Sequence, residues 1–372
     1  MRVALVHDWL TGMRGGERCL EVFCELYPEA DLYTLLHVPG TMSPIIERRR
    51  IVTSFVQKLP AAARCYRYYL PLFPAAIDRF DLRGYDLVLS SSHCVAKSVL
   101  APGGPHVCYC FTPMRYVWDM YDEYFGARAG LRTRALMPPV AAALRRWDRR
   151  TSRRVDHFVA ISHFVADRIR RFYGRAADVI HPPVDVQRFR LGEDDPEDFY
   201  LVVSALTPYK RVDLAVEAAN RMSRRLKIVG SGPEESRLRA LAGPTVEFLG
   251  WRRDDEVADL YRQCRALLFP GLEDFGIVPL EAMAAGRPVI AFGAGGALET
   301  VVPLDGEEPA TGLFFPRQSV EALVQAIGRF EGAAHRFEPK ACRARAERFD
   351  RPRFKERIAR YIDDRMAEAA RC

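Results

Sequence analysis

Apolar runs of strand length alternate with helical patterns from one end of the chain to the other. The first run, Val3–His7, precedes a helical pattern over Glu17–Tyr27, in which apolar residues recur every three or four positions. The later runs of the first half are Leu32–Leu36, Tyr85–Ser90, His106–Phe111, Val155–Ile161 and Val179–His181. Alternation of strands and helices predicts a parallel sheet with right-handed crossovers, so we expect a doubly wound α/β domain here.

A second series of the same kind follows a segment with the composition of a linker. Pro182–Asp198 begins with two prolines and ends in acidic residues. The apolar runs after it are Phe199–Leu206, Leu226–Val229, Val246–Leu249, Ala266–Phe269, Val289–Phe292 and Leu313–Phe315. We therefore predict two doubly wound, Rossmann-like domains that face a cleft, over residues 1–183 and 196–350. Residues 351–372 contain an Arg-rich amphipathic helix, which in a protein of this kind can pack back across the cleft.

The composition adds no further element to the predicted fold, but it excludes several classes of protein. The 372 residues are 49% hydrophobic and 28% charged, which is ordinary for a soluble globular protein and enough for two cores. No stretch approaches the roughly 20 apolar residues of a membrane span. The run Val3–Val6 stops at His7 and Asp8, as in a buried strand and unlike a signal peptide. We expect a cytoplasmic protein without a disulfide framework, because its nine cysteines are scattered.

The net charge of +7 resides almost wholly in residues 1–185, whereas the remainder is balanced. A basic half indicates an anionic partner, such as nucleic acid, a membrane surface or a phosphorylated substrate. Within it, residues 48–73 interleave basic residues with aromatic and aliphatic ones, which favours peripheral contact with anionic lipid. A basic helix that packs its aromatic residues inward has the same pattern, and both interpretations stay open.

Two turns after predicted strands are candidates for binding phosphate. Gly15 and Gly16 open the first helix, where glycines let the backbone approach a ligand and the helix N-terminus favours an anion. The turn is not G-x-G-x-x-G, so NAD is disfavoured; a plain tight turn is the alternative. Lys210 and Arg211 precede a helix in the second domain. Cations are disfavoured there, a conflict that a bound diphosphate would remove; a solvated basic turn is the alternative.

The most informative pattern follows the strand that ends at Phe269. Glu273 stands in the next loop and Glu281 in the first turn of the next helix, so the two carboxylates can lie at different depths of one pocket. Carboxylates bind vicinal sugar hydroxyls through paired, charge-assisted hydrogen bonds. For Glu281, a helix-capping acid is the alternative. Backbone N–H groups that can point at phosphate or sugar oxygens belong to Phe275, Gly276 and Ile277.

This pattern resembles the E-x7-E signature of retaining glycosyltransferases of the GT-B fold, family 4, with Glu273 and Glu281 as the two glutamates. Further matches to that family are the Gly15–Gly16 turn, Pro208–Arg211, Gly230–Pro233 and Ala285–Val289. The N-terminal half, through His7–Gly12 and Thr112–Tyr116, also resembles bacterial mannosyltransferases of surface-polysaccharide assembly. The matches span nearly the whole chain.

The resemblance implies a role for each of these residues. Lys210, with Arg211 nearby, would neutralise the diphosphate of a nucleotide-sugar donor, in place of a metal and without a cofactor. Glu281 would hold the nucleotide ribose, and Glu273 would bind the donor sugar and favour its oxocarbenium-like charge. Backbone N–H groups would come from Phe275, Gly276 and Ile277, and from Gly15 and Gly16 of the opposite domain.

The chain departs from the family at two positions. Ala205 stands where relatives often have an arginine, and Arg211 is the candidate for that charge. Phe111 stands where many relatives have a histidine, so a base at that point is absent and His93 is a candidate substitute. A surface or core histidine is the commoner explanation for His93. The other acceptor-side candidates are Arg115 and Asp119.

No metal site is expected from the sequence. His106, Cys108 and Cys110 alternate, so all three would face one side of a strand. No distant Cys or His cluster completes a site, and a buried apolar strand explains them better. The adjacent acidic pairs do not form a D-x-D element.

Together these features predict a retaining, metal-independent hexosyltransferase of polysaccharide biosynthesis. The donor would be GDP-mannose, with a UDP-sugar as the alternative, and the acceptor a glycolipid or oligosaccharide such as a polyprenyl-diphosphate-linked one. The enzyme would lie in the cytoplasm, at the inner face of the membrane if its basic segment binds lipid. A sugar-nucleotide epimerase would need acid and base residues across the cleft, and a nucleic-acid-binding protein would need a motif that the sequence lacks.

Overall fold

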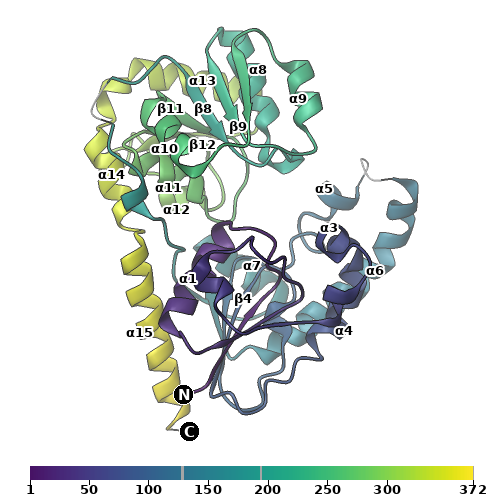
Figure 1. Cartoon of the computed structure of the whole chain (residues 1–372). Helices are drawn as coiled ribbons and strands as arrows, with labels where there is room; N and C mark the ends of the chain where they lie inside the picture. The colour runs from purple at the N-terminus through teal and green to yellow at the C-terminus, as the bar shows by residue number, and fades with distance from the viewer. Residues whose placement is uncertain (127–129, 193–194, 372) are drawn as a thin grey trace. The chain divides into compact units, whose positions relative to one another are not determined.

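The computed structural model describes residues 1–126, 130–192 and 195–371. Its chain divides into two compact units (Figure 1). Unit 1 comprises Met1–Pro182 together with Phe354–Cys372, and unit 2 comprises Pro183–Arg353. The chain therefore enters unit 2 at the two prolines of the linker-like segment and later returns to unit 1.

Unit 1 contains a 7-stranded parallel sheet with the order β3-β2-β1-β4-β5-β6-β7. The strands are β1 (Val3–His7), β2 (Asp31–Thr34), β3 (Ile51–Thr53), β4 (Leu87–Ser92), β5 (His106–Cys110), β6 (His157–Ala160) and β7 (Asp178–Val179). The central strands β1, β4 and β5 are buried along their whole length, as expected where both faces of a parallel sheet are covered. The sequence pattern missed β3, which is too short to show a period.

Helices connect the strands of unit 1, and the first of them lies where the sequence predicts a helix. They are α1 (Gly15–Leu26), α2 (Pro44–Glu47), α3 (Ala62–Cys65), α4 (Phe73–Ile77), α5 (Tyr121–Phe125), α6 (Leu131–Thr151) and α7 (His163–Tyr173). The ends of α7 have clear local causes. The Ser162 hydroxyl accepts a hydrogen bond from the Val165 N–H at 3.0 Å, and Gly174 takes the left-handed conformation after the last turn.

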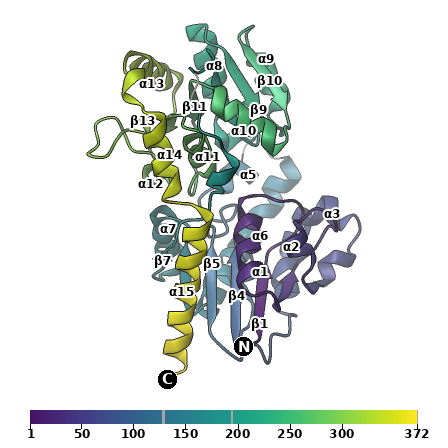
Figure 2. The same ribbon diagram turned by 60° about the vertical axis from the view of Figure 1, so that its left-hand side comes forward.

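Helix α15 (Arg351–Ala369) completes unit 1 from the far end of the chain (Figure 2). Its buried residues Phe354, Ile358 and Ile362 recur every four positions and so form one face. The Phe354 ring centroid lies 6.1 Å from that of Phe23 on α1 and 5.5 Å from that of Tyr109 on β5. The helix thus supplies part of the core of unit 1.

Unit 2 contains a 6-stranded parallel sheet with the order β10-β9-β8-β11-β12-β13. The strands are β8 (Tyr200–Val203), β9 (Leu226–Val229), β10 (Val246–Gly250), β11 (Ala266–Phe269), β12 (Val289–Phe292) and β13 (Gly312–Phe315). Its helices are α8 (Val212–Met222), α9 (Glu235–Leu241), α10 (Asp254–Gln263), α11 (Ile277–Ala284), α12 (Ala297–Thr300), α13 (Val320–Gly332) and α14 (Pro339–Glu347). The two doubly wound α/β units agree with the predicted fold class.

Each sheet has one point at which the strand order reverses direction. In unit 1 the chain builds outward from β1 to β3 on one side and from β4 to β7 on the other. In unit 2 the same reversal lies between β8 and β11. Open parallel sheets bind ligands outside the carboxyl ends of the two strands at this switch point. The residues that follow β1, β4, β8 and β11 therefore define where a site is expected. Among the described residues, no helix has both the length and the apolar character that crossing a bilayer requires.

Candidate active site

Lys210 and Glu273 meet at the switch point of unit 2. Lys210 ends a 3₁₀ turn, Pro208–Lys210, that follows β8, and Glu273 lies in the loop that follows β11. Lys210 Nζ forms an ion pair with Glu273 Oε1, and their side chains are only 20% and 13% exposed. Two residues 63 positions apart in the sequence thus form one partly buried charged pair where a ligand is expected.

Glycines hold the loop of Glu273 in place. A Cβ at Gly271 would lie 3.0 Å from the Lys210 Cα, so this glycine lets the two loops approach closely. On the other side, the Gly296 N–H donates to the Glu273 carbonyl at 2.9 Å. A Cβ at Gly296 would lie 2.2 Å from the Phe275 Cα, nearer than any real contact. The glycines that follow β11 and β12 therefore fix the position of the Glu273 backbone.

Glu281 lies on α11 and is held by a buried tyrosine. The Tyr261 hydroxyl of α10 donates to Glu281 Oε2 at 2.9 Å. Burial raises the pKa of Tyr261 well above its usual value, and the neighbouring Glu281 charge adds to this, so the hydroxyl stays protonated as a donor. Most of α11 is buried, whereas Glu281 is half-buried. Its carboxylate is therefore oriented by Tyr261.

The start of α11 has the geometry of an anion-binding helix end. Gly276 precedes the helix with a φ of +96°, which favours glycine, and Ile277 is its first residue. The first N–H groups of a helix have no partners within it. Phe275 is buried, with its ring centroid 5.8 Å from that of Phe349. Its side chain is part of the core, so it has only backbone groups to offer a ligand.

Arg211 lies beside Lys210 but has its own carboxylate partner. Its φ is +51°, and its Nε lies 3.1 Å from Asp213 Oδ1 in the first turn of α8. Asp213 also reduces the conflict between a cation and the positive end of that helix. The structure thus brings Lys210 to Glu273 and Arg211 to Asp213.

In unit 1, Gly15 and Gly16 form the first turn of α1, directly after β1. A Cβ at Gly16 would lie 3.3 Å from the Phe111 ring and 3.8 Å from His7 Cε1. His7 Nδ1 lies 2.8 Å from Ser91 Oγ, and its Nε2 lies 3.6 Å from a Glu17 carboxylate oxygen. The glycine turn therefore lies directly over a buried polar group at the end of β1.

His93 follows β4 and contacts Asp8, a residue that the sequence analysis did not single out. Asp8 Oδ2 lies 3.2 Å from His93 Nδ1, and the carboxylate is fully buried. Burial alone would raise the pKa of Asp8, but the charges of His93 and His7 and the N–H donors of the following turn hold it below its usual value. The carboxylate is therefore ionised at neutral pH. A charged residue directly after a buried strand was the available signal for Asp8.

The two other acceptor-side candidates, Arg115 and Asp119, have different surroundings. Arg115 follows β5 and lies near enough to His93 to lower the pKa of that histidine. Asp119 instead forms an ion pair with Arg168 of α7, whose other guanidinium nitrogen donates to the Thr112 hydroxyl at 2.7 Å. Arg168 is nearly buried, so Asp119 has a structural partner of its own.

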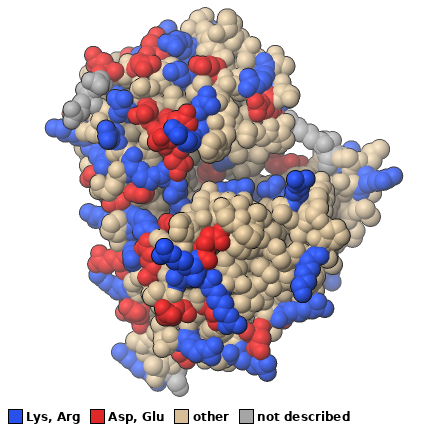
Figure 3. Space-filling view, viewed as in Figure 1, with Lys and Arg blue, Asp and Glu red and all other residues tan. Residues whose placement is uncertain are grey.

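The basic segment 48–73 divides between core and surface. Tyr66, Leu70 and Phe73 are buried in the core of unit 1. Tyr68 and Leu72 are 84% and 41% exposed. The exposed basic residues beside them include Lys58, Arg64 and Arg67. The segment therefore packs some of its aromatic residues inward and leaves others exposed beside basic residues. On the face of the molecule that Figure 3 shows, a broad uncharged area of unit 1 is bordered by Lys and Arg side chains and by a few Asp and Glu side chains.

The alternating residues of β5 are structural. His106, Cys108 and Cys110 are all fully buried. His106 Nε2 lies 2.7 Å from Ser90 Oγ, and its Nδ1 lies 3.1 Å from the Arg154 carbonyl oxygen. Both ring nitrogens are thus used within the protein. Across the described ranges, no cluster of three or more metal-ligating side chains occurs.

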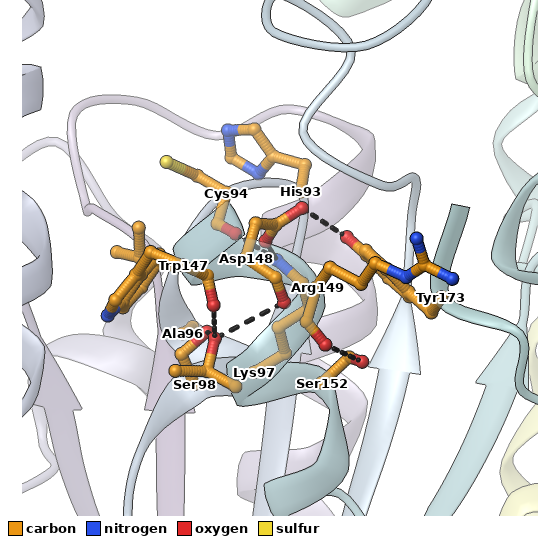
Figure 4. A network of polar contacts seen from close by, with 12 residues as sticks. His93, Cys94, Ala96, Lys97, Ser98, Trp147, Asp148, Arg149, Ser152 and Tyr173 are labelled. Carbon is orange, nitrogen blue, oxygen red and sulfur yellow. Dashed lines mark hydrogen bonds and ion pairs between the residues drawn. The ribbon is translucent and has the colours of Figure 1, made fainter. Parts of the chain in front are cut away.

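A second buried charged pair, Lys97 with Asp148, was not foreseen either (Figure 4). Both side chains are completely buried, and Lys97 Nζ lies 2.6 Å from Asp148 Oδ1. The Trp118 indole and the Tyr173 hydroxyl both donate to Asp148 Oδ2 at 2.8 Å. Burial opposes the charge of Lys97, but Asp148 outweighs it and raises the lysine pKa above its usual value.

Both units match family models of glycosyltransferases. Residues 13–188 match the model of "Glycosyltransferase Family 4", and residues 183–346 match that of "Glycosyl transferases group 1". A GDP-mannose-dependent alpha-(1-6)-phosphatidylinositol monomannoside mannosyltransferase of Mycobacterium tuberculosis is 32% identical over 331 residues, which is 73% of this chain and 82% of the relative. A GDP-mannose-dependent monoacylated alpha-(1-6)-phosphatidylinositol monomannoside mannosyltransferase of Corynebacterium glutamicum is 34% identical over 210 residues, 48% of this chain and 54% of the relative. The chain spans about half the length of several of the curated relatives that it matches.

Solved structures agree at the level of the fold. The Anabaena protein HepE in complex with UDP superposes with a TM-score of 0.70 over 98% of this chain and 100% of that one, at 18% sequence identity. The two doubly wound units thus have the GT-B fold of glycosyltransferases. Within that class, the chain belongs to glycosyltransferase family 4.

Proposed function

We propose that this protein is a retaining hexosyltransferase that transfers mannose from GDP-mannose to a glycolipid or oligosaccharide acceptor. The observation that carries the proposal is the Lys210–Glu273 pair at the switch point of unit 2, with Glu281 on the adjoining helix. The relatives from Corynebacterium and Mycobacterium are named as GDP-mannose-dependent mannosyltransferases, which favours this donor over others.

The pair suggests how a donor is received. Without a ligand, Lys210 and Glu273 neutralise each other. A donor diphosphate would attract the Lys210 ammonium, and the Glu273 carboxylate would then be available for hydroxyls of the sugar and for the positive charge that develops at its anomeric carbon. The cation and the N–H groups at the start of α11 would stabilise the departing diphosphate, a role that needs neither metal nor cofactor.

The rest of the site fits the two ends of a nucleotide sugar. Glu281, oriented by Tyr261, would accept hydrogen bonds from the ribose hydroxyls. The acceptor hydroxyl would attack from the face that the diphosphate leaves, with a phosphate oxygen as the base, which retains the anomeric configuration. A covalent intermediate on Glu273 is the less favoured route to the same stereochemistry.

Glu273→Gln tests this assignment. The amide keeps the size of the side chain but loses the charge, so we expect the rate of sugar transfer to fall between about 10-fold and 1000-fold, the range for one lost charge-stabilising contact. Glu321→Gln, at an exposed position at the start of α13, is the matched control and should be unchanged. Full activity of the Glu273 variant would end the assignment.

A UDP-sugar is the second candidate donor, favoured by the complex of HepE with UDP. Thermal unfolding with GDP, with UDP and with duplex DNA separates the alternatives. The preferred nucleoside diphosphate should raise the midpoint in proportion to its affinity, and DNA should leave it unchanged. Stabilisation by DNA alone would favour a nucleic-acid-binding protein instead.

For the acceptor, we propose a polyprenyl-diphosphate-linked glycan at the cytoplasmic face of a membrane in polysaccharide biosynthesis. The exposed face of residues 48–73 supports this, since Tyr68 and Leu72 stand beside exposed arginines. Vesicles with anionic lipid should retain the protein at low salt, and Arg64→Glu with Arg67→Glu should weaken retention. Equal retention by neutral vesicles, or none by anionic ones, would contradict a basic docking face.

A further inference from the structure

The turn that follows β4 is organised by a single buried carboxylate. Asp8 accepts hydrogen bonds from four consecutive backbone N–H groups, those of residues 93 to 96, at 2.7, 2.9, 2.7 and 2.8 Å. An ionised carboxylate has about four lone-pair positions, and here each oxygen receives two of the four donors. Asp8 follows β1 and the turn follows β4, so this contact joins the two strands of the switch point in unit 1.

The same turn is also held through its carbonyl side. Lys97 Nζ donates to the Cys94 carbonyl and pairs with Asp148 of α6 (Figure 4). The Tyr116 hydroxyl in turn contacts the Cys94 sulfur. The N–H groups of this turn donate to one buried carboxylate, and one of its carbonyl groups accepts from a buried ammonium. The turn therefore has little freedom to move. The position of His93 is therefore determined by the core of unit 1.

The His93 ring is oriented as well as positioned. Its Nδ1 lies 3.2 Å from Asp8 Oδ2, and its centroid lies 4.5 Å from the Trp9 ring in an edge-to-face arrangement. In Figure 4 the ring projects away from the Lys97–Asp148 pair. This contact is electrostatic and is not a fifth hydrogen bond to Asp8. The negative charge beside Nδ1 favours the neutral ring that has its proton on Nδ1 and its lone pair on Nε2. The side chain is 31% exposed, so a ligand can reach it.

We propose that Asp8 is a positioning residue that presents His93 Nε2 as a hydrogen-bond acceptor for a hydroxyl group of the sugar acceptor. The inference rests on the proposed function, because it names how the acceptor is held in that reaction. The location supports it, since His93 follows the second strand of the switch point, where a ligand of unit 1 is expected. The chemistry supports it too, since a neutral imidazole nitrogen pairs with a neutral hydroxyl without attracting the anionic donor.

Protonation of His93 would remove this acceptor. The charged and titratable groups that face the ring are Asp8 and His7 from β1 and its end, Glu17 from α1 and Arg115 from the segment after β5. Burial lowers the pKa of His93, as do His7 and Arg115, while Asp8 and Glu17 raise it, and the net shift is downward. His93 is thus neutral at neutral pH. As the pH falls through its lowered pKa, the KM for the acceptor should rise while kcat changes less.

Nitrogen-15 NMR of histidine-labelled full-length protein tests the orientation directly. The His93 signals are assigned by their loss in His93→Gln, and we expect a neutral ring with the proton on Nδ1. In Asp8→Asn the pKa of His93 should fall further, because the charge that raises it is gone. A proton on Nε2, or an unchanged pKa in that variant, would overturn the role of Asp8. Should Asp8→Asn fail to fold, the wild-type spectrum still decides.

Steady-state kinetics tests the role of the ring, with octyl α-mannoside, octyl α-glucoside and free water as competing acceptors. In His93→Gln we expect the ratio of transfer to hydrolysis to fall at least 10-fold and the acidic rise in acceptor KM to vanish. His335→Gln, at an exposed position in unit 2, is the matched control. The proposal would be overturned if His93→Gln kept the wild-type ratio of transfer to hydrolysis and the wild-type pH profile. It would also be overturned if the wild-type protein hydrolysed the donor but transferred sugar to neither glycoside. If neither GDP nor UDP raised the thermal midpoint of the wild-type protein, that result would instead count against the proposed function.

Discussion

Single residues at the site depend on partners that lie far away in the sequence. Lys210 and Glu273 were predicted one by one, because each follows an apolar run and the carboxyl ends of parallel strands share an edge. Their direct contact was not predictable, since it requires β8 and β11 to be neighbours, and strand order is decided by packing. The same holds for the partner of Glu281, because Tyr261 lies in a helical pattern that indicates only a core position.

The Tyr261–Glu281 hydrogen bond gives a first prediction. Tyr261→Phe removes the donor at 2.9 Å, so the Glu281 carboxylate is less well oriented. We expect the KM for the donor to rise several-fold with little change in kcat, and the free energy of unfolding to fall by about 1 kcal/mol. Tyr124→Phe, on the surface, is the control for kinetics and urea unfolding. An unchanged KM would mean that Glu281 is held by other contacts.

The buried Lys97–Asp148 pair gives a second prediction. Lys97→Met leaves the Asp148 charge without its cation in a completely buried position. We expect unfolding in urea to show a loss of about 3–5 kcal/mol. Lys58→Met, at an exposed position, should change stability by less than about 0.5 kcal/mol. Similar values for the two variants would show that water or another group compensates the aspartate.

At the scale of elements, the loop after β11 is shaped by glycines of two neighbouring loops. The sequence indicated a loop that carries Glu273 after the strand ending at Phe269, but not that Gly296 of the next loop touches it. Close approach between loops depends on the spacing of β11 and β12 in the sheet, which periodicity does not reveal. Helix ends depend by contrast on local contacts, as the hydrogen bond from the Val165 N–H to the Ser162 hydroxyl at the start of α7 shows.

Gly296→Ala tests the role of this contact. Its Cβ would lie 2.2 Å from the Phe275 Cα, so the loop must move and carry Glu273 with it. We expect the transfer rate to fall at least 10-fold, with a lower thermal midpoint. Gly328→Ala, in α13 where a Cβ would meet no atom within 4 Å, should instead stabilise the protein by about 0.5–1 kcal/mol. Wild-type activity of the Gly296 variant would show that the loop can shift without disturbing Glu273.

At the scale of the whole molecule, both units follow the same rule. In each unit, the two strands of the switch point are followed by two titratable side chains that contact each other. They are Asp8 and His93 in unit 1 and Lys210 and Glu273 in unit 2. The sequence predicted two doubly wound domains because most strands of both series show as apolar runs, separated by helical patterns. It did not predict that the last helix supplies core to the first unit, since an amphipathic face does not name its partner.

Phe354→Ala tests that contribution. The ring is buried against Phe23 and Tyr109, and its loss should destabilise unit 1 by about 3–5 kcal/mol. Hydrogen–deuterium exchange should accelerate in β1, β5 and α1 and stay unchanged in β8 to β13. Asp364→Ala, on the exposed side of α15, should leave both patterns as they are. Faster exchange confined to unit 2 would contradict the placement of the helix.

Because α15 follows unit 2 in the chain, translation order and folding order cannot coincide. The ribosome makes β1 to β7 first, yet their core lacks Phe354, Ile358 and Ile362 until synthesis has passed through the whole of unit 2. A nascent chain would therefore carry an incomplete first unit while the second one folds. The half of the protein that is made first is completed last, and during that interval it is the part most in need of a chaperone.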